Sequence, residues 1–130
     1  MAKVLVVDDE PGYRASLNFF LTRGGHEVLA VANAAQALER ASRFEPQVLV
    51  ADWLLGTPSN GAELARQLRA SLPRLQVILI TGLDANVVGQ KLEGVSIFRV
   101  LEKPFEPSVL EQTVIDAAAA HDTGAGPVGP

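Results

Sequence analysis

The sequence predicts an α/β domain in which five parallel strands form a doubly wound sheet with helices on both faces. Five short apolar runs recur along the chain, and segments with helical spacing separate them. The 130 residues, 48% of them hydrophobic, are enough for one core and too few for two domains. Short runs rich in β-branched residues are typical of strands buried on both faces of a parallel sheet.

The apolar runs define the predicted strands. They cover residues 4–7, 28–31, 48–51, 77–80 and 97–101. None approaches the roughly 18 residues that a membrane-spanning helix requires, and the N-terminus lacks the pattern of a signal peptide. We therefore expect no membrane partner. The sequence has no cysteine, which is compatible with a reducing cytosol, and we expect a cytoplasmic location.

Helices are predicted between the strands. The first ends at the pair Gly24-Gly25, as helices often do. Two capping pairs open the second and third helices: Asn33 with Gln36, and Asn60 with Glu63. The side chains expected to face the sheet from these three helices are Tyr13, Leu17, Phe20, Leu21, Leu38, Ala41, Leu64 and Leu68.

The last two helices differ in their apolar faces. A fourth helix over 84–91 is expected to be the most mobile, because its inner face is thin and Gly89 interrupts it. A fifth helix begins at Pro107 and runs to about residue 121. Residues 122–130 contain three Gly and two Pro and are predicted to form a flexible tail, which leaves a single domain over 1–121.

Composition excludes several classes of function. The absence of cysteine rules out thiolate zinc sites, iron–sulfur clusters and a disulfide scaffold. A net charge of −4 argues against direct binding of nucleic acid, which needs a basic surface. The paired arginines of two helices, and both histidines, are expected to be solvent-exposed surface residues: Arg40, Arg43, Arg66, Arg69, His26 and His121.

Polar side chains follow four of the predicted strands. Asp8 and Asp9 follow the first, Asp52 the third, Thr81 the fourth and Lys103 the fifth. Because the carboxyl ends of parallel strands meet at one edge of a sheet, we expect these side chains to lie together. Clustered carboxylates either have raised pKa values or bind a cation, and Mg²⁺ prefers oxygen ligands.

A carboxylate in such a site can act as a nucleophile toward phosphorus. Asp52 is the predicted nucleophile, since it stands alone after the central strand, whereas Asp8 and Asp9 form a pair suited to a metal ion. Phosphoryl transfer also needs a fixed cation and hydrogen-bond donors. Lys103 supplies the cation, and the Thr81 hydroxyl supplies a donor.

The stretches VLVVDDEP, VLVADW, VILITG and LEKPF resemble the receiver domain of two-component response regulators, over about residues 3–120. The spacings of 43, 29 and 22 residues that separate Asp9, Asp52, Thr81 and Lys103 are also similar to those of the family. The resemblance implies a flavodoxin-like (βα)5 fold with strand order 2-1-3-4-5. The last predicted strand contains the charged residue Arg99, which supports a position for this strand at the edge of the sheet.

The resemblance also implies a ligand set for Mg²⁺ or Mn²⁺. Asp9, Asp52 and the backbone carbonyl of Leu54 would bind the ion directly, and Asp8 would act through water. Asp52 would accept the phosphoryl group from a phosphohistidine on a sensor histidine kinase or a histidine phosphotransfer protein.

Three further expectations follow from the resemblance. Thr81 would move toward the phosphoryl group, and Lys103 would pair with it. The bond between Lys103 and Pro104 would be cis. Phosphorylation would change the face formed by the fourth helix, fifth strand and fifth helix, which would then act on an output protein or form a dimer.

The chain is expected to be a stand-alone single-domain form, because little sequence follows the fifth helix.

The sequence departs from the family pattern at a few positions. Val100 stands where the family usually has the aromatic residue of its switch, and Phe98 lies two residues earlier. The loop over 53–61 is one residue longer than the common version. Leu54 and Leu83 are apolar where relatives that dephosphorylate quickly carry polar groups, so we expect a long-lived phosphoryl group.

Two other functions compete with a phosphoacceptor domain. A pseudo-receiver would bind partners without phosphorylation, although the complete set of acids, Thr and Lys weighs against it. A phosphatase with an aspartate nucleophile would have Asp-x-Asp after the first strand and a substrate cap, and neither is present in the sequence. We expect the chain to catalyse only its own phosphorylation and dephosphorylation, and so not to be an enzyme toward other substrates.

Overall fold

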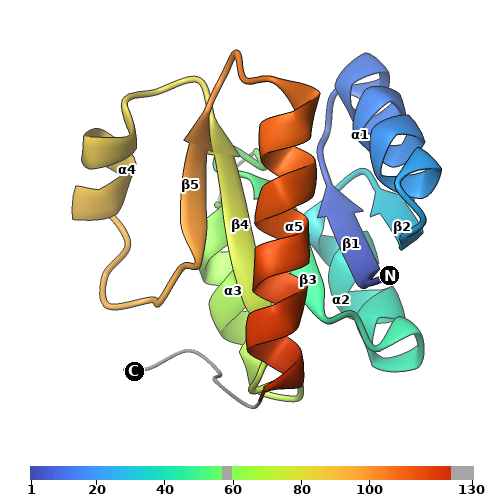
Figure 1. Cartoon of the computed structure of the whole chain (residues 1–130). Helices are drawn as coiled ribbons and strands as arrows, with labels where there is room; N and C mark the ends of the chain where they lie inside the picture. Colours follow the sequence, from blue (N-terminus) through green and yellow to red (C-terminus); the bar gives the residue numbers. More distant parts are fainter. Residues whose placement is uncertain (57–59, 124–130) are drawn as a thin grey trace.

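A computed structural model describes residues 1–56 and 60–123 of the chain, in which five strands and five helices alternate (Figure 1). All four strand pairs are parallel, and the strands, numbered along the chain, lie in the order 2-1-3-4-5. The predicted fold class and strand order are therefore confirmed. The tail was predicted to begin at residue 122, but Asp122 is the last residue of the fifth helix, which continues one residue further than expected. The rest of the predicted tail, from residue 124 onward, and the middle of the lengthened loop, 57–59, lie outside the described residues.

The elements have the following bounds. The strands are β1 (Lys3–Val7), β2 (Glu27–Val31), β3 (Val48–Asp52), β4 (Gln76–Thr81) and β5 (Arg99–Glu102). The helices are α1 (Pro11–Arg23), α2 (Ala34–Phe44), α3 (Gly61–Arg69), α4 (Ala85–Gln90) and α5 (Pro107–Asp122). The expected caps are present, because the side chains of Asn33 and Asn60 accept hydrogen bonds from the backbone N–H groups of Gln36 and Glu63.

The core has two layers, one on each face of the sheet. Successive strand residues point to opposite faces, which is why the continuous apolar run of β1 is buried throughout. Val4 and Val6 pack with α1 and α5, whereas Leu5 and Val7 pack with α2, α3 and α4. Figure 1 shows α1 and α5 in front of the sheet and α2 and α3 behind it.

The last strand differs from its prediction. The apolar run suggested residues 97–101, but the ladder with β4 begins where Arg99 pairs with Ile78, and β5 ends at Glu102. The Phe98 N–H donates to the Val77 carbonyl (2.8 Å) just before the ladder begins. Ile97 and Phe98 are apolar because they pack against opposite layers of the core, not because they lie in the strand.

Two helix side chains that were expected to face the sheet point outward. Phe20 is 38% exposed and Leu38 is 41% exposed. Each lies one position, about 100° of rotation, from the buried stripe of its helix. In α2 that stripe consists of Ala37 and Ala41, two small residues that allow the helix to lie close to the sheet.

Two residues expected on the surface are instead partly or fully buried. His26 is only 7% exposed, because its Nδ1 accepts a hydrogen bond from the Ala2 N–H (3.0 Å) beside the start of β1. Arg69 is half-buried because its guanidinium donates to the carbonyls of Leu75 and Ser96. Both side chains satisfy backbone groups where loops leave the sheet and helices.

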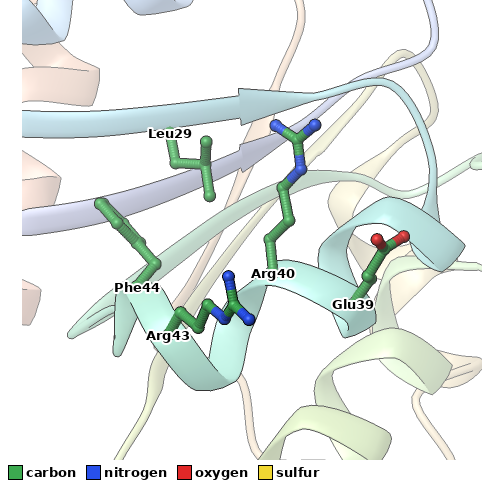
Figure 2. A pocket seen from close by; sticks show the side chains of 5 residues that line it. All are labelled: Leu29, Glu39, Arg40, Arg43 and Phe44. Atoms are coloured by element: carbon green, nitrogen blue, oxygen red, sulfur yellow. The ribbon is translucent and has the colours of Figure 1, made fainter.

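A hollow of the described surface lies between β2 and α2 (Figure 2). It is lined by Leu29, Glu39, Arg40, Arg43 and Phe44. None of the polar residues that follow the strands takes part in it. Among the described residues, no helix is both long and apolar enough to cross a lipid bilayer.

Candidate functional site

The polar residues predicted to meet do come together at the carboxyl edge of the sheet. Asp8 and Asp9 directly follow β1, and Asp52 is the last residue of β3. Thr81 ends β4, and Lys103 directly follows β5. The chain reverses its winding direction between β1 and β3, and a crevice at that point is where parallel α/β sheets hold their ligands.

Three carboxylates form the centre of this site. One oxygen each of Asp8, Asp9 and Asp52 lies within 4.8 Å of the others. Asp8 is buried (1% exposed), and this burial raises the pKa of its carboxyl group, as do the charges of Asp52 and Asp9. A nearby cation relieves such repulsion, and a hard divalent ion takes oxygen ligands of this kind. The donor set therefore fits Mg²⁺ or Mn²⁺.

Backbone contacts fix the orientation of Asp8. Its Oδ1 accepts a hydrogen bond from the Glu10 N–H (2.9 Å), which partly offsets the rise in the Asp8 pKa. Arg14, in the first turns of α1, donates to the Asp8 carbonyl (2.8 Å). One of these hydrogen bonds restricts the side chain of Asp8 and the other restricts its backbone, so the carboxylate stays close to Asp52.

Asp52 is held between a backbone amide and a cation. Its Oδ1 accepts a hydrogen bond from the Leu54 N–H (3.2 Å), and its Oδ2 lies 3.5 Å from the Lys103 Nζ. The following residue, Trp53, is buried and donates from its N–H to the Ile80 carbonyl (2.8 Å). This bond extends the contact between β3 and β4 past the end of the ladder, so the backbone at Asp52 is fixed.

Lys103 and Thr81 are joined through the backbone. The Lys103 N–H donates to the Thr81 carbonyl (2.7 Å), and the Lys103–Pro104 bond is cis, as the resemblance implied. Thr81 is buried (1% exposed), and its Oγ1 accepts a hydrogen bond from the Leu83 N–H (2.8 Å). Because a hydroxyl that accepts one bond can still donate its own proton, Thr81 suits the donor role assigned to it.

Two residues of the site were missed as functional residues. Tyr13 was expected only to face the core, but its ring lies against Lys103, with the Nζ 4.2 Å from the ring centroid. Gly61 was not singled out, yet a Cβ at this position would lie 2.8 Å from the Asp52 carbonyl oxygen. The position of Tyr13 one helical turn before Leu17 was a usable signal, whereas nothing local marks Gly61.

The apolar residues beside the site are exposed. Leu54 is 62% exposed and Leu83 is 42% exposed, so both lie on the surface instead of packing in the core. Val100 packs against the layer that contains α2 and α3, whereas Phe98 packs against the layer of α1 and α5. Phe98 therefore does not take the place of an aromatic residue at position 100.

Comparison with known proteins identifies the class to which this fold and site belong. The family model of the response regulator receiver domain matches residues 4–115, so the chain belongs to the receiver domains of two-component signalling. A chemotaxis protein CheY homolog of Campylobacter jejuni is 34% identical, and the match covers 95% of both chains.

Another relative is longer than this chain, and two solved structures share its fold. The alkaline phosphatase synthesis transcriptional regulatory protein PhoP of Bacillus subtilis is 32% identical over 81% of this chain, but the match spans only 43% of that relative. The chemotaxis response regulator CheY4 of Vibrio cholerae has a TM-score of 0.81 at 27% identity, covering 90% of this chain and 98% of that one. A response regulator receiver domain protein from Clostridium thermocellum, 24% identical, also has a TM-score of 0.81 and covers 95% of this chain and 98% of that one.

Proposed function

We propose that Asp52 accepts a phosphoryl group from a phosphohistidine donor, on a sensor histidine kinase or a histidine phosphotransfer protein. A carboxylate oxygen of Asp52 forms a bond to phosphorus while the phosphorus–nitrogen bond of the donor breaks. The imidazole leaves with the electron pair of that bond as a neutral ring, because its other nitrogen carries a proton. The product is an aspartyl phosphate, and the protein acts on no other substrate.

Asp9, Asp52 and the Leu54 carbonyl would hold Mg²⁺ or Mn²⁺, with Asp8 acting through water. The ion supplies positive charge that offsets the charge of the phosphoryl oxygens. The chain's own groups do the rest: the Lys103 ammonium pairs with the phosphoryl group, and the Thr81 hydroxyl donates to it. Such positioning and neutralisation of charge account for most of the catalysis in phosphoryl transfer.

One observation carries the proposal. Three carboxylates lie within 4.8 Å of one another, and a lysine ammonium lies 3.5 Å from the one that ends β3. A purely structural role for Asp8 in the turn before α1 explains its hydrogen bond to the Glu10 N–H, but it does not explain why Asp9, Asp52 and Lys103 converge at the same edge of the sheet. A phosphoryl-transfer site, which needs a nucleophile, a cation and metal ligands, accounts for the position of all four residues.

Intact-protein mass measures the gain of a phosphoryl group directly. The protein is incubated with phosphoramidate, which has a phosphorus–nitrogen bond, and separately with acetyl phosphate, with and without Mg²⁺. We expect a gain of one phosphoryl group that requires Mg²⁺ and is abolished by Asp52→Asn. The matched control is Asp116→Asn, since Asp116 is an exposed residue of α5 that bonds to Gln112. If the wild type gains no mass from either donor, the proposal is overturned and the pseudo-receiver remains.

We further propose that phosphorylation acts through the face of α4, β5 and α5. Val88 is the one buried residue of the short helix α4, so few contacts oppose its movement. Val87 (40% exposed) and Val109 (43% exposed) present apolar surface on this face to an output protein or to a second copy. Backbone amide NMR shifts that change in α4 and β5 on phosphorylation would support this, and changes confined to the loops at the site would contradict it.

A further inference from the structure

We infer that the aromatic ring of Tyr13 positions the Lys103 ammonium beside Asp52, an inference that rests on the proposed function and deepens it. The Nζ of Lys103 lies 4.2 Å from the centroid of the Tyr13 ring and 3.5 Å from Asp52 Oδ2. An ammonium within about 6 Å of a ring centroid is attracted by the electrons of the ring face. The same charge therefore has two partners on different elements, β3 and α1.

Lys103 needs a second contact because the ion pair with Asp52 is loose. A charge-assisted N–H···O bond is about 2.7–2.9 Å long, whereas the Nζ to Oδ2 distance is 3.5 Å. The backbone of Lys103 is fixed by the bond from its N–H to the Thr81 carbonyl (2.7 Å), but four rotatable bonds separate that backbone from the charge. The ring restricts where these bonds can place the ammonium.

Tyr13 is itself well placed for this role. It lies in the first turn of α1, four residues before buried Leu17, so its side chain continues the stripe that faces the sheet. The ring is partly buried against the apolar layer of α1 and α5. It therefore presents a rigid face at the carboxyl edge of the sheet, where Lys103 emerges.

The ring is what matters in this contact, not the hydroxyl. Phe retains the aromatic face, whereas Leu retains apolar bulk without it. We expect Tyr13→Phe to gain the phosphoryl group at the wild-type rate, and Tyr13→Leu to gain it about two- to fivefold more slowly, the range that a cation–ring contact of this exposure supports. In a Lys103→Met background, Tyr13→Leu should have no further effect, because the ring acts through Lys103.

A second measurement detects the contact without any phosphorylation. The chain has three lysines, Lys3, Lys91 and Lys103, so selective labelling gives three side-chain NMR signals, and Lys103→Met identifies one of them. Protons over a ring face are shifted upfield. The Lys103 signal should be shifted upfield in the wild type and in Tyr13→Phe, and should lose that shift in Tyr13→Leu.

Lys3 provides an internal control, because its Nζ lies 4.8 Å from the centroid of the Phe44 ring. Its signal should stay constant in the Tyr13 variants, which also shows that Tyr13→Leu remains folded. If Tyr13→Leu leaves the Lys103 signal unchanged, or matches the wild-type rate of phosphoryl gain, the inference is overturned. If the wild type gains no phosphoryl group, the proposed function fails, and the lysine signals still decide whether Tyr13 holds Lys103.

Discussion

Replacing Gly61 with alanine tests whether close packing beneath the site fixes the phosphoacceptor. The first residue of α3 crosses the end of β3 so closely that a Cβ at Gly61 would lie 2.7 Å from the Leu79 Cδ2 and 2.8 Å from the Asp52 carbonyl oxygen. Ordinary contacts between such atoms are about 3.5–4.0 Å long. Leu79 is fully buried, and the Asp52 oxygen belongs to the backbone, so neither atom can move aside without disturbing its neighbours.

The size of the effect follows from this clash. Overpacking of a dense core costs about 1–3 kcal/mol, and the better helix propensity of alanine returns up to about 1 kcal/mol. We expect Gly61→Ala to lower the free energy of unfolding by about 1–2 kcal/mol. At the usual unfolding entropy per residue, this corresponds to a Tm lower by about 4–8 °C for a chain of this length.

Thermal and urea unfolding, followed by circular dichroism, measure this difference. Gly89→Ala is the matched control, because Gly89 is exposed within α4 and a Cβ there meets no atom within 4 Å. The control should raise the free energy of unfolding by up to about 1 kcal/mol. A Gly61→Ala protein with a Tm equal to or above that of the wild type would refute the reasoning.

Two other predictions concern acid stability and the lifetime of the phosphoryl group. Burial, with the charge of the N-terminus, lowers the pKa of His26 below its ordinary 6.5, so the unfolded chain binds the proton first as the pH falls. The free energy of unfolding, measured with urea, should therefore decrease as the pH drops below about 6.5, by at most about 1.4 kcal/mol per pH unit. The decrease should be smaller in His26→Gln, which keeps an acceptor for the Ala2 N–H. Equal slopes in the two proteins would contradict this, and His121→Gln controls for the loss of a histidine. Leu54→Asn adds an amide beside the site that can form a hydrogen bond to an attacking water. Intact-protein mass followed over time should therefore show the phosphoryl group lost about fivefold faster than in the wild type. The control Leu54→Ala should lose it at the wild-type rate. Wild-type hydrolysis within seconds would show that the exposed leucines do not protect the phosphoryl group.

The strands and helix starts could be predicted because their causes are local. A parallel sheet covered on both faces requires continuous apolar runs such as Val4 to Val7, which are visible in the sequence. Asn33 and Asn60 cap their helices through hydrogen bonds to residues three positions later, so their roles also depend on neighbours in the chain. The predicted start of β5 was wrong, because Ile97 and Phe98 are apolar residues that the core buries whether or not they lie in a strand.

Side-chain environments set by distant elements could not be predicted. His26 is buried because it meets Ala2, 24 residues away, and Arg69 is half-buried because it reaches Ser96, 27 residues away. Leu38 and Ala37 are adjacent in the sequence, and only the approach of α2 to the sheet decides that the smaller one is buried. Periodicity identifies a helix but leaves its rotation uncertain by about one residue.

The sequence by itself determined the fold class and the candidate site, because each polar residue of the site lies at or just after the carboxyl end of a strand, and parallel strands share one carboxyl edge. Asp8, Asp9, Asp52, Thr81 and Lys103 follow from that rule alone. Only the tertiary structure decided the contacts that hold them, such as the Tyr13 ring against Lys103 and the close approach of Gly61 to Asp52. Tyr13 and Lys103 are 90 positions apart in the chain, and in both contacts the two residues belong to different elements. The distances between them depend on how the helices pack on the sheet, and no local sequence pattern encodes that packing.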